Sequence, residues 1–385
     1  MKSLLIPGIY HKFGWDAHQG GLEAFAVTTW KILNRTKNDS CTILVPADTT
    51  LEPVPYPLIK WKRDSKESNP TSKIASNEID IKISAIQKKK FDYIINSADH
   101  DIPMKFTEGL IKLGVPYLHV VHIHPRGHAR YYFWKKLFAL KKEYPHIRIA
   151  VVSEYLKRKV FEQFGYDVDY VLPLGFDESL GEANFVQTPL NEVVYVGRVT
   201  MIKNVQHLTS WLDKTSYKLH LIGPRWSNIN SIRILDMKWA HETLPSNVIE
   251  HGLKTQNELK HLVKDKLCLI SPLPTETFSL AAFGAQKLGV PVVSIQKEKD
   301  EAINEYMIEG KTGFTVKLRP NQRLSHIEDK VLDAIEKCKT LDRKFIYEHF
   351  NKVYPSEIYE RNLRDILNKC QKPTNELIDK WKVEI

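Results

Sequence analysis

The sequence predicts an α/β protein made of two doubly wound domains, each a mostly parallel sheet covered by helices on both faces. Short apolar, β-branched segments alternate with longer helical patterns along nearly all of the 385 residues, which is typical of βαβ units. The composition, with 42% hydrophobic and 26% charged residues, is that of a globular chain and excludes a largely disordered one. At about 100–200 residues per domain, the length fits two domains.

In the first half of the chain, strands and helices alternate with few exceptions. Apolar runs predict strands at residues 4–10, 41–46, 93–97, 117–122, 148–153 and 170–173. Helical periodicity predicts helices at residues 22–33, 79–89, 103–113, 129–142 and 154–164. This order favours a sheet whose parallel strands are joined by helical crossovers.

The second half repeats the same rhythm. Strands are expected at residues 193–197, 219–223, 248–251, 267–271, 290–295 and 314–316. A polar segment without periodicity, Gly175–Asn191, separates the halves and contains two glycines and a proline. We therefore expect domains at 1–180 and 181–355, followed by C-terminal helices at 356–385 that pack back toward the first domain.

The charge and the cysteines narrow the class of partner and the compartment. The net charge is +10, which favours a nucleic acid or an anionic membrane surface but is also common in proteins without such partners. Four widely spaced cysteines without a CxxC pattern indicate neither a zinc site nor a disulfide scaffold, and favour the cytoplasm. We expect no transmembrane segment, because no apolar run approaches about 18 residues. We also expect no secretory signal, because the apolar part of the N-terminal MKSLLIPGIYHKFGWD is too short and is followed too soon by polar residues.

A glycine pair, Gly20 and Gly21, stands between the first predicted strand and its helix. Glycines at such a turn let backbone amides approach a phosphate at the helix N-terminus, although they also occur in ordinary turns. The surrounding residues match neither the GxGxxG nor the GxxxxGK[ST] pattern, so dinucleotide and P-loop chemistry are not indicated.

Two cations follow the first strand of the second half. In the segment VVYVGRVTMIKN, Arg198 comes directly after Gly197, and Lys203 lies five residues later at the start of the next helix. Arginine can bind two phosphate oxygens at once and lysine adds a point charge, so the pair suits a diphosphate. Two solvated surface cations are the alternative.

A third segment, SPLPTETFSLAAFGAQKLGVPVV at residues 271–293, places Glu276 in a loop after an apolar strand. Ser279 or Leu280 can begin the helix that follows. A carboxylate in this position can accept hydrogen bonds from sugar hydroxyls, and the amides at the helix start can bind phosphate. The alternative is a first-turn acid that only complements the helix dipole.

These segments resemble glycosyltransferases with the two-Rossmann-domain GT-B architecture, in particular the large retaining family with an E-x7-E motif. The matching pieces follow the family order along most of the chain: GGLE, VVSEYLKRKV, LPLGFD, YVGR with KN, NVIEHG, and ETF with GVPVV. The resemblance implies an acceptor domain at 1–180 and a nucleotide-sugar donor domain at 181–355, facing each other across a cleft. It also implies transfer from a nucleotide sugar, expected to be a UDP-sugar, with no permanently bound cofactor.

The resemblance also assigns site residues. It matches Arg198 and Lys203 to the pair that neutralises the diphosphate, Glu276 to the glutamate that holds the donor sugar, and His122 to an active-site histidine. A histidine that merely ends a strand is the alternative for His122. The predicted donor-binding set is Gly20, Gly21, Gly197, Arg198, Lys203, Glu276, Thr277, Phe278, Ser279 and Leu280.

The chain departs from the family at the second glutamate of the motif, because position 284 is Gly284. In the family that glutamate holds the nucleotide ribose, so a different mode of ribose recognition is expected here. The resemblance further implies retention of anomeric configuration without a metal ion. We therefore interpret two D-x-D strings, Asp99/Asp101 and Asp167/Asp169, as loop acids.

The acceptor is predicted from the first domain, where basic and aromatic residues are interleaved. Examples are Lys60–Arg63, the lysine run Lys88–Lys90, and the segment Arg126–Lys136. Such surfaces suit either nucleic acid or anionic lipid headgroups. FDYIINSA and the pair His122 and His124 also resemble the T-even phage α-glucosyltransferases, which modify hydroxymethylcytosine in DNA; Ile123 replaces their intervening aspartate.

Three functions follow from these observations. We slightly favour a glycosyltransferase acting on hydroxymethylated pyrimidines of phage duplex DNA, in the host cytoplasm. The near-equal alternative is an enzyme of envelope polysaccharide or glycolipid synthesis with peripheral membrane contact. The third is a non-catalytic module that binds a nucleotide sugar or nucleic acid, suggested only by Gly284.

Overall fold

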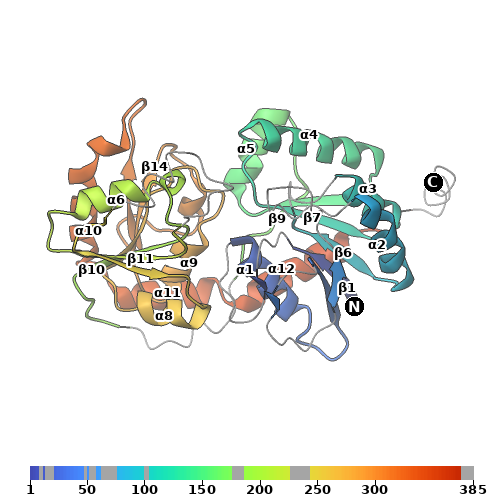
Figure 1. The fold of residues 1–385 in the computed structure, drawn as a ribbon, viewed down its shortest axis with the longest axis horizontal. Coiled ribbons are helices and arrows are strands. Elements are labelled where there is room, and N and C mark those ends of the chain that lie inside the picture. Colours follow the sequence, from blue (N-terminus) through green and yellow to red (C-terminus); the bar gives the residue numbers. More distant parts are fainter. Residues whose placement is uncertain are drawn as a thin grey trace. The chain divides into compact units, whose positions relative to one another are not determined.

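The computed structural model describes residues 1–7, 12–13, 21–46, 50–51, 58–61, 76–98, 104–175, 186–225 and 243–373. The chain forms two compact units (Figure 1). Unit 1 comprises Met1–Gly175 together with Ser356–Ile385, and unit 2 comprises Phe176–Pro355. The last described helix therefore belongs to the same unit as the N-terminus, although it follows unit 2 in the sequence.

Unit 1 is built on a seven-stranded sheet in the order β5-β3-β1-β6-β7-β8-β9, and every neighbouring pair is parallel. Its strands are β1 Lys2–Ile6, β3 Ser40–Pro46, β5 Leu58–Trp61, β6 Tyr93–Asn96, β7 Tyr117–Val121, β8 Ile147–Val151 and β9 Tyr170–Val171. Two short strands, β2 Lys12–Phe13 and β4 Thr50–Leu51, form a separate pair. The central strands are mostly apolar and almost entirely buried, because both faces of the sheet are covered.

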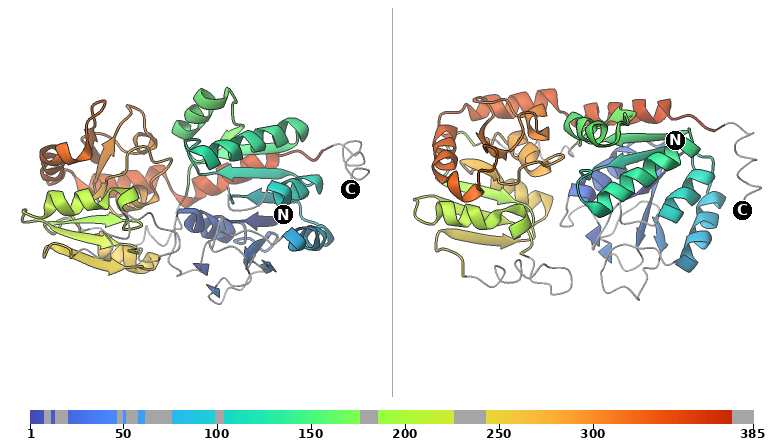
Figure 2. Two further views of the ribbon diagram at one scale, coloured as in Figure 1. Left: turned by 45° about the horizontal axis from the view of Figure 1, so that its top comes forward. Right: turned by 90° about the horizontal axis from the view of Figure 1, so that it is seen from above.

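Helices cover both faces of this sheet (Figures 1 and 2). They are α1 Gly21–Ile32, α2 Ser76–Lys88, α3 Met104–Lys112, α4 His128–Glu143, α5 Glu154–Phe164 and α12 Ser356–Lys369. The C-terminal helix α12 packs beside α1, where the buried Tyr359 hydroxyl lies 2.7 Å from Thr29 Oγ1. Arg364 of α12 forms an ion pair with Asp39 at 2.9 Å.

Local sequence signals explain where these helices begin and end. The Ser153 hydroxyl caps α5 by accepting a hydrogen bond from the Leu156 amide, and Gly165 ends the helix in the left-handed conformation at φ 68°. The predicted helix at 154–164 is confirmed with the same bounds. Three strands were not predicted: the short strands β2 and β4, and the edge strand β5, which is formed by the segment LIKW and pairs with β3.

Unit 2 contains a six-stranded parallel sheet in the order β12-β11-β10-β13-β14-β15. Its strands are β10 Glu192–Val196, β11 Lys218–Ile222, β12 Val248–Gly252, β13 Cys268–Ser271, β14 Val292–Gln296 and β15 Gly313–Lys317. The order reverses at β10, so that β10 and β13 are neighbours although two strands separate them in the sequence. The predicted α/β fold with doubly wound sheets is confirmed for both units.

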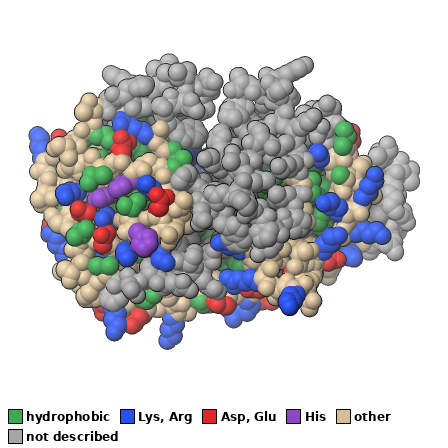
Figure 3. Space-filling view, turned by 60° about the horizontal axis from the view of Figure 1, so that its bottom comes forward, with side chains coloured by type: hydrophobic (Ala, Val, Ile, Leu, Met, Phe, Trp, Pro, Cys, Tyr) green, Lys and Arg blue, Asp and Glu red, His purple; other side chains and the backbone are tan. Residues whose placement is uncertain are grey.

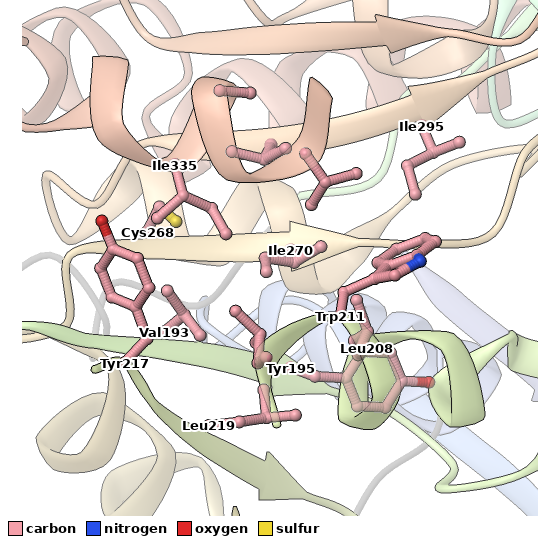
Figure 4. Packing of buried hydrophobic residues seen from close by; sticks show 14 of the residues in the cluster. Val193, Tyr195, Leu208, Trp211, Tyr217, Leu219, Cys268, Ile270, Ile295 and Ile335 are labelled. Atoms are coloured by element: carbon pink, nitrogen blue, oxygen red, sulfur yellow. The ribbon is translucent and has the colours of Figure 1, made fainter. Parts of the chain in front are cut away.

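Two hydrophobic cores enclose the sheet of unit 2. Helices α6 Val205–Leu212 and α10 Glu328–Cys338 cover one face, where Trp211 and Ile335 pack on β10, β11 and β13 (Figure 4). Helices α8 Gln256–Val263, α9 Leu280–Lys287 and α11 Arg343–Val353 cover the other face. Short 3₁₀ turns, η2 Met201–Lys203, η3 Ala302–Glu305 and η4 Leu324–His326, complete the unit.

A buried arginine, Arg343, connects three segments of unit 2. It is 2% exposed, and its guanidinium donates hydrogen bonds to the carbonyls of Val186 at 2.8 Å, Lys264 at 2.7 Å and Lys266 at 2.7 Å. Burial lowers the pKa of Arg343 to about 10. Three neutral carbonyls thus take the place of a carboxylate partner.

All four cysteines, Cys41, Cys268, Cys338 and Cys370, are buried as free thiols. Within the described residues, no helix is long and apolar enough to cross a membrane.

Candidate functional site

The loops that follow β10 and β13 lie at the same edge of the unit 2 sheet, because these parallel strands are direct neighbours. The first loop runs from Gly197 to Asn204 and includes η2; the second runs from Pro272 to Ser279. The side-chain amide of Asn204 donates to the Pro272 carbonyl at 3.1 Å and joins the two loops. Asn204 itself has a left-handed backbone at φ 60°, which asparagine tolerates better than most residues.

An ion pair between Lys203 and Glu276 forms the centre of this edge. The Lys203 Nζ lies 2.6 Å from Glu276 Oε1, and each side chain is 23% exposed. Both residues were predicted as site residues, and they are 73 positions apart in the sequence. A cation and a carboxylate are thus held together at the carboxyl end of the sheet, where ligands bind in open α/β folds.

Arg198 lies on the same loop, directly after Gly197, and its residue is exposed. The Tyr195 hydroxyl donates to the Arg198 carbonyl at 2.9 Å and fixes the backbone there. Burial, with a contribution from the nearby Glu276 charge, raises the pKa of Tyr195, so its hydroxyl stays protonated and continues to donate.

Two glycines allow the loops after β10 and β11 to come close together. Gly197 has φ 151° and Gly223 has φ 143°, and a Cβ atom on Gly223 would lie 1.9 Å from the Gly197 carbonyl oxygen. No side chain fits at that distance, so Gly223 is required for the backbone path beside Arg198. Sequence analysis identified Gly197 but not Gly223, for which the pair Gly223-Pro224 after the strand is a usable signal.

The start of α9 provides the remaining predicted residues of unit 2. The Ser279 hydroxyl accepts a hydrogen bond from the Ala282 amide at 3.4 Å and caps the helix before Leu280. The buried Tyr306 hydroxyl donates to the Ser279 carbonyl at 3.0 Å, and the Phe278 ring packs 5.3 Å from the Tyr306 ring. The first turn of α9 therefore begins beside Glu276 and Thr277, where its amides suit an anion.

Glu301, which the sequence did not predict as a site residue, holds the loop that contains Glu276. Glu301 is 3% exposed, and its carboxylate accepts hydrogen bonds from the amides of Thr275 at 2.8 Å, Lys297 at 2.7 Å and Glu298 at 3.0 Å. Thr275 immediately precedes Glu276 and has a left-handed φ of 69°, a strained conformation for a β-branched residue. Glu301 stands in the charged run KEKDE, which is typical of a solvated loop, so the sequence carried no signal for this role.

In unit 1, His122 follows β7, and its ring lies 4.7 Å from the Phe25 ring in an edge-on arrangement. Burial, with a smaller effect from His119, lowers the pKa of His122 to about 3, so the imidazole is neutral at physiological pH. His124 accepts a hydrogen bond from the Arg126 amide at 3.1 Å, which stabilises the turn before α4. Gly21 is the first residue of α1, and Gly20 lies outside the described residues.

The remaining predictions concern Gly284 and the acidic strings. Gly284 lies on the buried side of α9, between Phe283 and Ala285. Asp169 binds Lys141 and the Ile149 amide, and Asp167 pairs with Lys157, so both stabilise the chain near β9. Asp99 and Asp101 lie outside the described residues. Where the chain is described, no cluster of three or more histidine, cysteine or acidic side chains is arranged to hold a metal ion.

Comparisons with known proteins agree with this arrangement. Residues 178–348 match the family model described as "Glycosyl transferases group 1". The chain is similar to Anabaena Alr3699/HepE in complex with UDP and glucose (13% identity, TM-score 0.69, 96% of this chain and 100% of that one). It is also similar to a glycosyltransferase from Rickettsia africae (14%, 0.69, 97% and 99%) and to the lipopolysaccharide outer core galactosyltransferase WaaB (15%, 0.61, 96% and 100%).

No curated protein matches the sequence. At these identities the solved structures establish the fold, which is GT-B, and the residues that match the group 1 model all lie within unit 2.

Proposed function

We propose that the protein transfers a sugar from a nucleotide sugar to a hydroxyl acceptor. The observation that carries this proposal is the pairing of Lys203 with Glu276 at the carboxyl edge of the unit 2 sheet, inside the matched group 1 domain. We propose a UDP-sugar as donor, in line with the UDP and UDP-glucose bound by the similar Anabaena protein.

Each residue of the edge has a role in this reaction. Arg198 and Lys203 bind the diphosphate, the amides at the start of α9 add hydrogen bonds to it, and Glu276 accepts hydrogen bonds from the sugar hydroxyls. During transfer, the bond between the anomeric carbon and the diphosphate oxygen breaks while the acceptor oxygen bonds to the same carbon. The acceptor proton passes to the departing diphosphate oxygen. The cations stabilise the negative charge that develops on the departing diphosphate.

Two finer features of the reaction are part of the proposal. Attack from the face that the diphosphate leaves retains the anomeric configuration, and no protein-bound metal takes part. His122, which is neutral, acts on the substrates by hydrogen bonding and not as a cation.

Duplex DNA with hydroxymethylated bases and an envelope saccharide or glycolipid are the two acceptor classes that we consider. The basic segment Arg126–Lys136 of unit 1 exposes fewer aromatic rings for stacking on DNA bases than its sequence indicates. Phe133 and Trp134 are 5% and 0% exposed, so neither ring is presented to a base. Tyr132, at 47%, keeps an exposed ring.

The test is donor turnover with a panel of labelled nucleotide sugars, each with and without hydroxymethylated duplex DNA, lipid and saccharide acceptors. Release of sugar or its transfer supports the enzyme, and the labelled product identifies the acceptor. If no donor is bound or consumed under any condition, the protein is not a glycosyltransferase. Donor binding without any turnover would indicate the non-catalytic module instead.

Substitution of Gly284 by glutamate tests ribose recognition. If the ribose occupies the position implied by the family motif, Gly284→Glu is expected to tighten UDP binding about tenfold, the size of one added hydrogen bond to a charged group. Calorimetric titration measures this change, with Gly284→Gln as the control for bulk. Equal affinity of Gly284→Glu and the original chain would show that the ribose binds elsewhere.

Glu301→Gln tests the support beneath the Glu276 loop. A glutamine oxygen replaces only one carboxylate oxygen, and the amide group opposes the other backbone N–H donors, so kcat is expected to fall about tenfold. Because burial raises the pKa of Glu301, its carboxylate becomes protonated as the pH falls, which weakens the loop and lowers kcat. This loss of activity at low pH is expected to be absent from the pH profile of Glu301→Gln, because glutamine does not titrate. Glu309→Gln, at an exposed carboxylate that binds the Thr315 amide, is the control. An unchanged pH profile in Glu301→Gln contradicts the assignment.

A further inference from the structure

Helices α4 and α5 of unit 1 expose a surface that the proposed transfer reaction does not use. Three large side chains on or beside these helices remain open to solvent: Phe161 at 56%, Tyr132 at 47% and Tyr166 at 47%. Single exposed apolar residues are ordinary, but Tyr132 and Tyr166 belong to one connected group of aromatic rings, which includes Phe164 on the same helix as Phe161.

The connection is made by ring contacts between the two helices. The Tyr132 ring lies 5.8 Å from Tyr131, which lies 5.2 Å from Phe164 of α5. Phe164 lies 5.7 Å from Phe138, and Phe138 stacks on Tyr166 at 4.4 Å. Phe161 stands one turn before Phe164 on the same side of α5, and we refer to the connected rings together with Phe161 as the aromatic strip.

Cations border this strip on the α4 side. This helix carries five lysines and arginines but one acid, Glu143. Lys141 is paired with Asp169, while Arg130, Lys135, Lys136 and Lys142 enter none of the ion pairs found among the described residues. By contrast, basic and acidic side chains are intermixed on the face of unit 2 that Figure 3 shows. The helix α4 is thus a local concentration of positive charge.

The α5 side carries basic and acidic side chains that balance each other. Lys159 and Arg158 pair with Glu162, and Lys157 pairs with Asp167. A phosphate backbone crossing both helices would meet these acids, and the exposed Phe161 offers it no hydrogen bond. Cations beside exposed phenylalanine and tyrosine rings are instead typical of proteins that lie on a bilayer surface.

We propose that the α4–α5 surface docks the protein onto a bilayer rich in anionic lipids. The cations of α4 lie against the headgroups, and Tyr132, Phe161 and Tyr166 enter the interface beside them. This proposal does not depend on the donor chemistry of unit 2. Docking would place unit 1 at a surface where a glycolipid acceptor is found.

Co-sedimentation of the full chain with vesicles tests the proposal. The protein is expected to bind vesicles containing one-third phosphatidylglycerol, to bind pure phosphatidylcholine weakly, and to lose binding as salt is raised. The double variant Lys135→Glu/Lys136→Glu is expected to bind at least about 30-fold more weakly, from about fivefold for each cation removed. Phe161→Ser is expected to weaken binding about tenfold without changing the net charge.

The matched control is Lys330→Glu/Lys352→Glu, which makes the same charge change at two exposed sites of unit 2. Circular dichroism establishes that each variant is folded. Equal loss in the control and the α4 variant overturns the proposal, because net charge alone would then explain binding. Absence of vesicle binding together with tight, Lys135-dependent binding to duplex DNA also overturns it and identifies a nucleic-acid surface.

Discussion

Lys203→Ala is expected to lower donor turnover about 10²–10³-fold, the usual loss when one preorganised donor to a developing negative charge is removed. Arg198→Ala is expected to cause a loss of the same order. The ion pair between Lys203 and Glu276 holds the lysine ammonium in place before the diphosphate arrives, so no reorganisation is needed during transfer. Steady-state kinetics with the best donor of the panel measures kcat and KM for each variant.

The matched control for Lys203→Ala is Lys254→Ala. Lys254 also pairs with a glutamate in unit 2, Glu258, at 3.1 Å. This pair lies on the surface at the start of α8, where ion pairs contribute little. We expect Lys254→Ala to keep normal turnover. Near-normal turnover in both Lys203→Ala and Arg198→Ala would show that the diphosphate binds elsewhere.

Arg343→Ala is expected to lower the free energy of unfolding by at least about 3 kcal/mol. It leaves the carbonyls of Val186, Lys264 and Lys266 without their donor, and an unsatisfied buried polar group costs about 1–3 kcal/mol. Thermal unfolding followed by circular dichroism should show the transition falling by about 6–12 °C, at about 2–4 °C for each kcal/mol.

Two further variants test the cause of this loss. Lys344→Ala changes the neighbouring residue, whose side chain is 63% exposed, and is expected to have little effect. Arg343→Lys keeps the charge but cannot present the planar fork that reaches three carbonyls, so it should recover only part of the stability. Full stability in Arg343→Ala would mean that water or a local shift satisfies these carbonyls.

Much of the fold was predictable because its signals are local. The helix at 154–164 was predicted with its observed bounds, since Ser153, Gly165 and the apolar spacing all lie within a few residues of one another. The predicted strands of both halves fall on observed strands, with ends that differ by a few residues. The short edge strand β5 was missed, because basic residues interrupt its apolar pattern and only pairing with β3 stabilises it.

The basic segment at the start of α4 shows that a short sequence pattern does not predict which side chains of a helix are buried. The sequence PRGHARYYFWKK contains cations and rings in alternation, and it suggested that the rings are available for stacking. The helix turns Phe133 and Trp134 into the core and leaves Tyr132 and the lysines outside. Which side of a helix faces the sheet depends on the whole helix and its neighbours, and a run of twelve residues does not decide it.

The sequence by itself determined the alternation of strands and helices and the chemical identity of the predicted donor residues Arg198, Lys203 and Glu276. The tertiary structure decided that Lys203 meets Glu276, because the sheet order places β10 beside β13 and brings their carboxyl ends together. It also revealed Glu301, whose three amide donors come from two separate loops. Periodicity and capping act over a few residues, whereas strand order and burial result from packing of the whole chain, and no local pattern encodes them.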